Sequence, residues 1–241
     1  MKKSFLFCLI STLLIVGCEG NSKKEEKTGD TSHTYFDEIM EKAENGDVES
    51  QFEVGNCYYN GDWVEKDIDE SMKWLQKSAE GGYAEAQVNL GSRYELGIGF
   101  AKDYEEAVKW YKKAADQGNM RAVCFLASCY ENGKGVLKDT DEALKLYQKA
   151  ADEGHAPGQY ELGCRYVLGI GVPQDAEKGM EWVRKAAYQG LAEAQNTMGD
   201  FYLSGKLTEV NYDEAVKWYK KAAAQGHEFS KAMLEQLGER Y

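Results

Sequence analysis

The chain of 241 residues carries 41 acidic and 29 basic side chains, which gives a formal net charge of −12. A negative field of this size repels phosphate backbones and argues against a nucleic-acid partner. The 25 glycines stand against only two prolines, and regular glycines in a proline-poor chain predict many short helices that end at glycine.

The first element is a predicted signal peptide over residues 1–17. Two lysines precede an apolar run over residues 4–16, which is shorter than a bilayer-spanning helix requires. The run ends directly before Gly17 and Cys18, and this ending resembles the lipobox of bacterial lipoproteins. The resemblance implies cleavage before Cys18, a diacylglyceryl group on its sulfur and acylation of the new amino terminus. The alternative is an uncleaved signal anchor with an incidental cysteine.

Residues 18–34 are predicted to form a flexible tether, because they contain no large apolar side chain that could offset the cost of ordering. A chain that begins in this way is expected in the bacterial cell envelope, held to a membrane by its lipid anchor. Glu19 gives no clear signal for retention in the inner membrane, so we expect the outer membrane in preference to the inner one.

The folded region is predicted to span residues 35–241, and it is built on a period of 36 residues. No insertion or deletion interrupts the period over five units. The recurring residues include Gly46, Gly82, Gly118, Gly154, Gly190 and Gly226, the tyrosines Tyr58, Tyr94, Tyr130, Tyr166 and Tyr202, and the tryptophans Trp74, Trp110, Trp182 and Trp218.

Each unit is predicted to form two helices, which we call helix A and helix B. In the second unit, helix A covers residues 84–96, and Gly97 ends it in a left-handed conformation. Gly91 lets a neighbouring helix approach closely. Helix B follows Asp103, whose side chain should accept hydrogen bonds from the free amides of the first turn, with Glu106 completing a variant of the capping box. The same pairs are Asp67 with Glu70, Asp139 with Glu142 and Asn211 with Glu214, whereas Asp175 is followed three residues later by Lys178.

A two-helix unit cannot bury its own aromatic face, but stacking on the next unit does so. The predicted fold is therefore all-α: a right-handed α-α superhelix, or solenoid, of five 36-residue helix-turn-helix repeats with half-repeats at both ends. The full repeats cover residues 48–82, 84–118, 120–154, 156–190 and 192–226, and the half-repeats cover 35–46 and 230–241. Trp63 and Leu207 stand where the other units have glycine, so we expect their turns to differ. Ala127 replaces the glycine of helix A and should widen that helix crossing.

The stretch from Ala84 to Gly118, AEAQVNLGSRYELGIGFAKDYEEAVKWYKKAADQG, is similar to the Sel-one-like repeats, which are relatives of the tetratricopeptide repeat. The resemblance covers residues 48–226. It implies an adaptor or scaffold role with a protein or peptide as partner, and a concave face lined by the A helices.

The resemblance also implies that the partner contacts positions of helix A beside its packing residues. These positions vary from unit to unit while the core does not. The candidate partner-binding residues are Phe52, Asn56, Tyr59, Val88, Ser92, Glu95, Arg121, Ser128, Tyr160 and Val167. We expect the apolar residues among them, Phe52, Tyr59, Tyr160 and Val167, to anchor the partner. The alternative is that these four side chains pack between adjacent A helices.

The sequence offers no cofactor or metal site that we can identify. The three histidines, His33, His155 and His227, have no partner spacing that is typical of metal ligands. Gly133, Lys134 and Gly135 form a repeat turn with no strand before it, unlike a nucleotide-binding loop.

Four cysteines, Cys57, Cys124, Cys129 and Cys164, lie within the repeats. They are expected to be thiols, although a bridge between Cys129 and Cys164 stays open. Some cysteine-rich relatives bear a disulfide in each repeat, and one group of them has been linked to penicillin binding. This sequence lacks their repeated cysteine pair and any Ser-x-x-Lys motif for acyl-enzyme chemistry.

These observations favour an envelope-anchored scaffold that binds a protein partner and is not an enzyme. Two alternatives belong to other classes. One is a hydrolase acting on cell-wall material or β-lactams, which depends only on the relatives. The other is a carbohydrate or peptide sensor with the concave groove as its pocket. The oligomeric state stays open.

Overall fold

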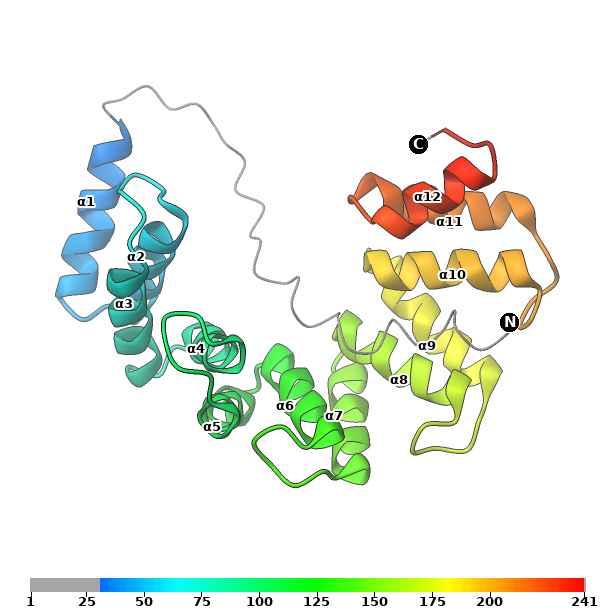
Figure 1. Ribbon diagram of the computed structural model, residues 1–241, viewed down its shortest axis with the longest axis horizontal. Coiled ribbons are helices and arrows are strands. Elements are labelled where there is room, and N and C mark those ends of the chain that lie inside the picture. Colours follow the sequence, from blue (N-terminus) through cyan, green and yellow to red (C-terminus); the bar gives the residue numbers. More distant parts are fainter. Residues whose placement is uncertain (1–30, 241) are drawn as a thin grey trace. The chain divides into compact units, whose positions relative to one another are not determined.

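The computed structural model describes residues 31–240, and within them the chain forms twelve α-helices and no strand (Figure 1). The helices are α1 (Thr31–Glu44), α2 (Val48–Asn60), α3 (Ile68–Glu80), α4 (Ala84–Leu96), α5 (Tyr104–Asp116), α6 (Met120–Asn132), α7 (Thr140–Asp152), α8 (Ala156–Leu168), α9 (Ala176–Tyr188), α10 (Ala192–Ser204), α11 (Tyr212–Ala224) and α12 (Glu228–Gln236). The predicted lipidation site, Cys18, and most of the predicted tether lie outside the described residues. Helix α1 begins at Thr31, four residues before the predicted start of the folded region.

The described residues divide into two compact units. The first comprises residues 31–125 and 133–137, and the second comprises residues 126–132 and 138–240. In the first unit, each helix from α1 to α4 packs against the next helix along the chain, and in the second unit the helices from α7 to α12 do the same. Consecutive helix pairs therefore pack as a solenoid, and the predicted all-α fold of five repeats with a half-repeat at each end is confirmed.

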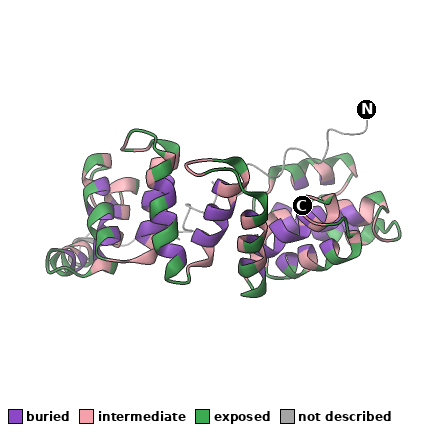
Figure 2. Cartoon of the chain, turned by 90° about the horizontal axis from the view of Figure 1, so that it is seen from below, coloured by how far each residue is buried: buried purple, intermediate pink, exposed green. Residues whose placement is uncertain are grey.

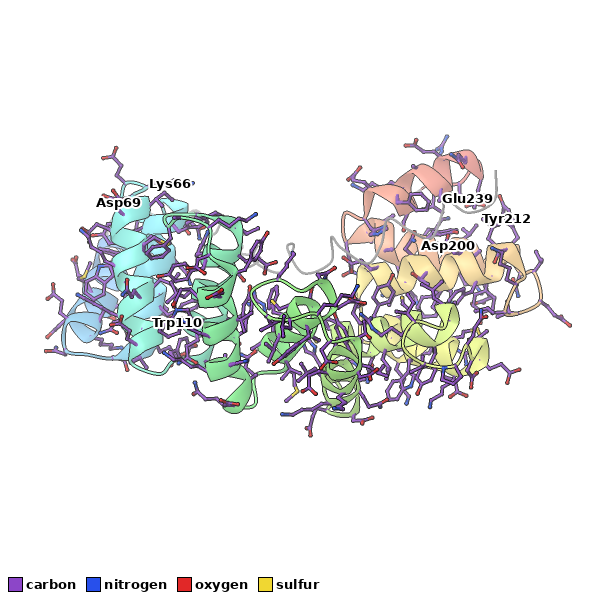
Figure 3. All side chains as sticks on the ribbon, turned by 60° about the horizontal axis from the view of Figure 1, so that its bottom comes forward. Lys66, Asp69, Trp110, Asp200, Tyr212 and Glu239 are labelled. Atoms are coloured by element: carbon purple, nitrogen blue, oxygen red, sulfur yellow. The ribbon has the colours of Figure 1, made fainter. Side chains whose placement is uncertain are left out.

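The core lies where one repeat covers the next. Trp110 of α5 (labelled in Figure 3) packs with Met72 and Leu75 of α3 and with Leu90 of α4. At the start of the first unit, Ile39 of α1 covers residues of α2 and α3 in the same way. At the end of the second unit, Leu234 of α12 covers α11. Figure 2 shows buried and exposed sides on the same helices, as expected for such stacking.

Helices A and B of one repeat meet at the helix A glycine. A Cβ atom added to Gly91 would lie 2.7 Å from the ring of Tyr111, and one added to Gly199 would lie 2.6 Å from the ring of Tyr219. A larger residue at either position would force the tyrosine ring or the helix to shift. The close approach predicted at Gly91 is confirmed, whereas the wider crossing expected at Ala127 stays a prediction.

A glutamine pair joins adjacent helix hairpins in three repeats. Gln87 on α4 donates to the carbonyl oxygen of Ala79 at 3.0 Å, and Gln117 donates to Oε1 of Gln87 at 2.8 Å. Gln159 with Gln189, and Gln195 with Gln225, repeat the arrangement. The buried amides are thereby satisfied, which lets polar side chains hold the seam between repeats.

The N-caps of the B helices are confirmed, but the second half of the predicted capping box is wrong. Oδ1 of Asp103 accepts from the amides of Glu105 and Glu106 at 2.9 and 3.0 Å. The amide of Asp103 donates instead to the carbonyl oxygen of Tyr94 at 2.9 Å. Because this main-chain bond already satisfies the cap amide, Glu106 is released and pairs with Lys109. All five repeats have the bond from the cap amide to the tyrosine carbonyl.

The turn of the first repeat does not differ as expected. Trp63 adopts a φ of 62°, close to the 73° of Gly99 in the next repeat. Trp63 is thus a bulky residue in the left-handed region, where L-residues are strained. Trp63 is 48% exposed, and the centre of its ring lies 5.1 Å from that of Tyr35. Leu207 is not in this region, so the expected difference applies to the turn of the fifth repeat only.

None of the four cysteines within residues 31–240 forms a disulfide, as expected. Burial raises the pKa of the Cys57 and Cys164 thiols to about 12. Both thiols are therefore protonated at neutral pH and poorly nucleophilic. Within the same residues, no helix is long and apolar enough to cross a membrane.

Replacing Trp63 with glycine should raise the free energy of unfolding by about 0.5 to 1 kcal/mol. The left-handed conformation costs a non-glycine residue about 1–2 kcal/mol. Glycine removes this strain, but its greater conformational freedom stabilises the unfolded chain and offsets part of the increase in stability. Urea denaturation measures the difference. Leu207→Gly is the matched control and should lose about 0.5 kcal/mol, because Leu207 has no such strain to relieve. A less stable W63G protein would contradict the strain argument.

His227 should make the stability of α12 depend on pH. Its Nδ1 accepts from the amide of Ser230 at 3.2 Å and caps α12. Burial lowers the pKa of His227 despite the nearby carboxylates of Glu193 and Glu228. A histidine whose pKa is lowered in the folded state stabilises the fold above its ordinary pKa, near 6.5, and loses that contribution as the pH falls below it.

His227→Asn should therefore flatten the loss of thermal stability between pH 7.5 and pH 5.5, because asparagine caps a helix without titrating in this range. Calorimetric melting temperatures across this range provide the measurement. His155→Asn is the control, since His155 precedes α8 at the equivalent position and its side chain makes no cap hydrogen bond. An unchanged pH profile in H227N would rule out the cap as the cause.

Candidate functional site

The predicted partner-contacting residues occupy four positions on each A helix, counted from the helix A glycine or its replacement, Ala127. We call the positions three before and one after it the inner positions, and those six before and four after it the outer positions. Tyr160 and Ser92 are at inner positions, whereas Arg121 and Val167 are at outer ones. No residue at an outer position is buried, whereas half of those at the inner positions are.

The side chain at the inner position three residues before the glycine is buried in four of the five repeats. Val88 is 0% exposed and Tyr160 is 1% exposed. The Tyr160 hydroxyl lies 3.2 Å from Oγ1 of Thr197 on α10, which is the next A helix. Ser92 is also buried, and its hydroxyl lies 3.3 Å from that of Tyr111. Val88, Ser92 and Tyr160 are therefore wrong as partner contacts, because they pack inside the protein.

In the first repeat, the apolar candidates are partly exposed and also held by neighbours. The ring of Phe52 lies 5.4 Å from that of Tyr83. The guanidinium of Arg93 lies 3.7 Å above the centre of the Tyr59 ring, and the Lys66 ammonium is 5.2 Å from it. A cation within about 6 Å of an aromatic face is attracted by it. These contacts fix the two rings without covering them completely.

The outer positions of the first unit form a charged surface whose side chains are joined by hydrogen bonds and ion pairs to other repeats. Glu85 accepts from Asn119 at 2.6 Å and pairs with Arg121 at 3.4 Å across repeats. Glu95 accepts from Lys134 at 2.8 Å and from the Tyr111 hydroxyl at 3.0 Å. Glu85, Glu95 and Arg121 stay partly exposed. The contacts with neighbouring residues therefore fix the positions of these charged groups, which remain accessible to solvent.

In the second unit, the corresponding region is structural. Arg165 of α8 donates to Glu131 at 2.6 Å and to Glu161 at 2.7 Å, and its guanidinium lies 3.8 Å from the centre of the Tyr147 ring. Arg165 and Glu161 are almost fully buried. Burial raises the pKa of Glu161, although the Arg165 charge opposes the shift. Removing one partner of such a buried pair costs about 3–5 kcal/mol, so this network belongs to the fold.

Two other candidates of the second unit are in mixed surroundings. Val167 is half-buried and packs close to Gly179 of α9, and Ser128 is partly exposed on α6. Asp200 on α10 (Figure 3) accepts from the Tyr219 hydroxyl at 2.6 Å, and burial raises the pKa of its carboxyl. The two apolar candidates of the fourth repeat, Tyr160 and Val167, are therefore largely used for packing.

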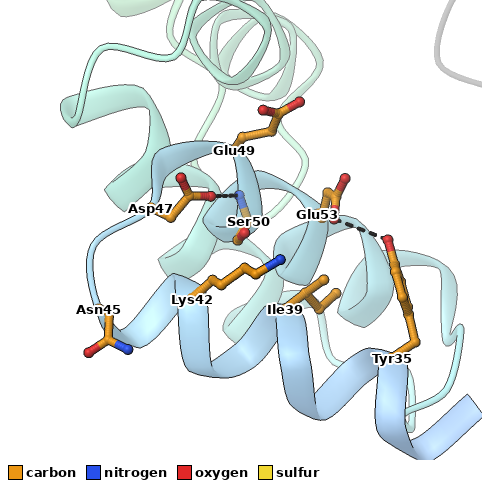
Figure 4. Close-up of a pocket in the computed structure, with 8 residues that line it drawn as sticks. All are labelled: Tyr35, Ile39, Lys42, Asn45, Asp47, Glu49, Ser50 and Glu53. Atoms are coloured by element: carbon orange, nitrogen blue, oxygen red, sulfur yellow. Dashed lines mark hydrogen bonds between the residues drawn. The ribbon is translucent and has the colours of Figure 1, made fainter.

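A pocket that sequence reasoning missed lies between α1 and α2 and has a volume of about 610 Å³ (Figure 4). The Tyr35 hydroxyl donates to Oε2 of Glu53 at 3.2 Å at one end, and Asp47 accepts from the amide of Ser50 at 2.8 Å near the other. The lining residues are Tyr35, Ile39, Lys42, Asn45, Asp47, Glu49, Ser50 and Glu53. Among the residues that the structure describes, no group of His, Cys, Asp and Glu could hold a metal ion.

The repeat region matches the Sel1 repeat family at residues 48–83, 84–119, 121–155, 156–191 and 192–227. Among curated proteins, no match to the chain was found. The comparisons give no support to the hydrolase alternative.

Several solved structures resemble the chain. A protective antigen of uropathogenic Escherichia coli with an SLR fold has 37% sequence identity and a TM-score of 0.70, over 85% of this chain and 44% of that one. The chain thus spans less than half of that protein. A Sel1 repeat protein of Oxalobacter formigenes has 29% identity and a TM-score of 0.75, over 85% of this chain and 89% of that one. An immunity protein of Pseudomonas aeruginosa, at 22% identity, a TM-score of 0.52 and a coverage of 88% and 76%, shares the fold alone. Five matched repeats over most of its length show that the chain belongs to the Sel1 repeat family.

Proposed function

We propose that this protein is a lipid-anchored scaffold of the bacterial cell envelope that binds a partner protein or peptide on the A helices of its first unit, and that it is not an enzyme. Sel1 repeat proteins are in general scaffolds for protein interactions. The observation that carries the proposal is the charged surface at the outer positions of α4 and α6, where Glu85, Glu95 and Arg121 are partly exposed and held by inter-repeat contacts.

A surface of this kind suits protein recognition. Fixed charges of both signs select a partner of complementary pattern and speed its encounter. Since the side chains are already held by neighbours, less conformational entropy is lost when a partner binds. Tyr59 on α2, whose ring lies under the Arg93 guanidinium of α4, adds a partly exposed aromatic ring. Aromatic residues are common among those that dominate binding energy.

The anchor belongs to the same proposal. Cys18 would carry the lipid, and residues 19–30 would link it to the repeats. Acyl chains hold such a protein stably at a membrane, with the outer membrane preferred. Anchoring would keep the repeat surface beside envelope partners.

Removing the Glu85–Arg121 pair, by Glu85→Gln with Arg121→Gln, should reduce recovery of cross-linked envelope partners at least fivefold. The double change leaves the net charge unaltered, and an exposed ion pair contributes only about 0–1 kcal/mol to stability, so the melting temperature should hardly change. Mass spectrometry after cross-linking in intact cells gives the readout.

The matched control removes an ion pair on helix B, by Glu106→Gln with Lys109→Gln, which also leaves the net charge unaltered. Partner recovery should then stay at the level of the parent protein. Equal recovery from both double variants would contradict a binding role for the α4 and α6 surface.

Cys18→Ser should abolish incorporation of labelled palmitate and move the protein from the detergent phase to the aqueous phase in a phase-separation assay, because no acyl group can then be attached. Cys57→Ser, which changes a buried thiol within the repeats, should leave both properties unchanged. Incorporation of palmitate into C18S would exclude Cys18 as the lipidation site.

A further inference from the structure

The pocket lies between α1 and α2, the first two helices of the first unit, and is acidic. Asp47, Glu49 and Glu53 contribute three carboxylates, and Lys42 contributes the one ammonium group among its lining residues. The difference is two negative charges in excess. The carboxylate of Glu53 stands directly beside Tyr35, as Figure 4 shows.

An exposed aromatic pair borders this pocket. Tyr35 is 43% exposed and Trp63 is 48% exposed, and their ring centres lie 5.1 Å apart at an angle of 57°. Tyr35 belongs to both features, because its ring contacts Trp63 and its hydroxyl points to Glu53. Two large aromatic rings left half open beside a carboxylate are not explained by packing of the core.

The position of Trp63 strengthens this argument. Three other repeats have glycine there, and Trp63 adopts the same left-handed conformation at a cost to stability. A strained residue that persists on the surface is a reason to look for a function. Compared with glycine, tryptophan at this position contributes an indole ring on the surface.

We infer that Trp63, Tyr35 and Glu53 form a site for a basic segment of a partner protein, which places an arginine or lysine side chain against the two rings and the carboxylate. The inference rests on the proposed scaffold function and names the chemistry of one partner segment. A cation is attracted both by aromatic faces and by a carboxylate acceptor. The protein uses the same chemistry internally, where Arg93 lies 3.7 Å above the Tyr59 ring.

The surrounding charge favours the same occupant. The chain has a net charge of −12, which steers cationic segments toward it. Lys42 also lines the pocket (Figure 4), and its single positive charge offsets only one of the three carboxylates. An acidic segment would be repelled by the two negative charges in excess.

The test measures fluorescence anisotropy of a labelled peptide, Gly-Ser-Arg-Gly-Arg-Ser-Gly, with the full chain purified in a nonionic detergent. In the matched peptide, both arginines are replaced with citrulline, which has nearly the same shape and no charge. We expect the arginine peptide to bind at least tenfold more tightly than the citrulline peptide. Trp63→Gly and Glu53→Gln should each weaken its binding at least fivefold.

Tyr188→Ser removes a 70% exposed aromatic ring from the second unit and should leave peptide binding unchanged. Because W63G is expected to be more stable than the parent protein, its loss of binding could not come from unfolding. Equal binding of the two peptides, or parental binding by both W63G and E53Q, would overturn the site. If partner capture still depends on Glu85 and Arg121 in that case, the scaffold proposal stands and only this inference fails.

Discussion

A helical hairpin of this length has more apolar surface than it can cover with its own two helices. Trp110 becomes buried only because α3 of the preceding repeat supplies Met72 and Leu75. The same requirement explains the half-repeats, since α1 and α12 cover helices that would otherwise face water. Burial of one repeat by another is thus the condition on which the helices, their order and their exposed positions depend.

Stacking also decides which part of helix A remains for recognition. The inner position three residues before the helix A glycine is buried in four of the five repeats, so side chains such as Val88 and Tyr160 pack inside the protein. The outer positions lie at the margins of that contact, where charged groups can pair across repeats and still reach water. The candidate interaction surface is therefore narrower than the full width of the A helices, and it is polar in the first unit.

The period, the helix boundaries and the N-caps could be predicted because each depends on local chemistry that recurs five times. The capping box was half wrong because a main-chain carbonyl from the preceding helix competes for the cap amide, and main-chain partners leave no trace in side-chain patterns. Variation from repeat to repeat was mistaken for exposure at Val88 and Tyr160, although their apolar character pointed to burial. The ion pair of Glu161 and Arg165 could have been predicted from the sequence, because residues four positions apart lie on the same face of a helix. The left-handed Trp63 and the pocket beside Tyr35 depend on three-dimensional arrangement and could not be foreseen.

The hydrogen bond from each cap amide to a tyrosine carbonyl has a consequence for how such a gene can change. Tyr94 and Asp103 are nine residues apart, and every repeat keeps this separation. A codon gained or lost within this segment would break the bond and displace the following cap, whereas duplication or deletion of an entire repeat leaves all such bonds intact. Related proteins should therefore differ in the length of their repeat region by whole multiples of 36 residues.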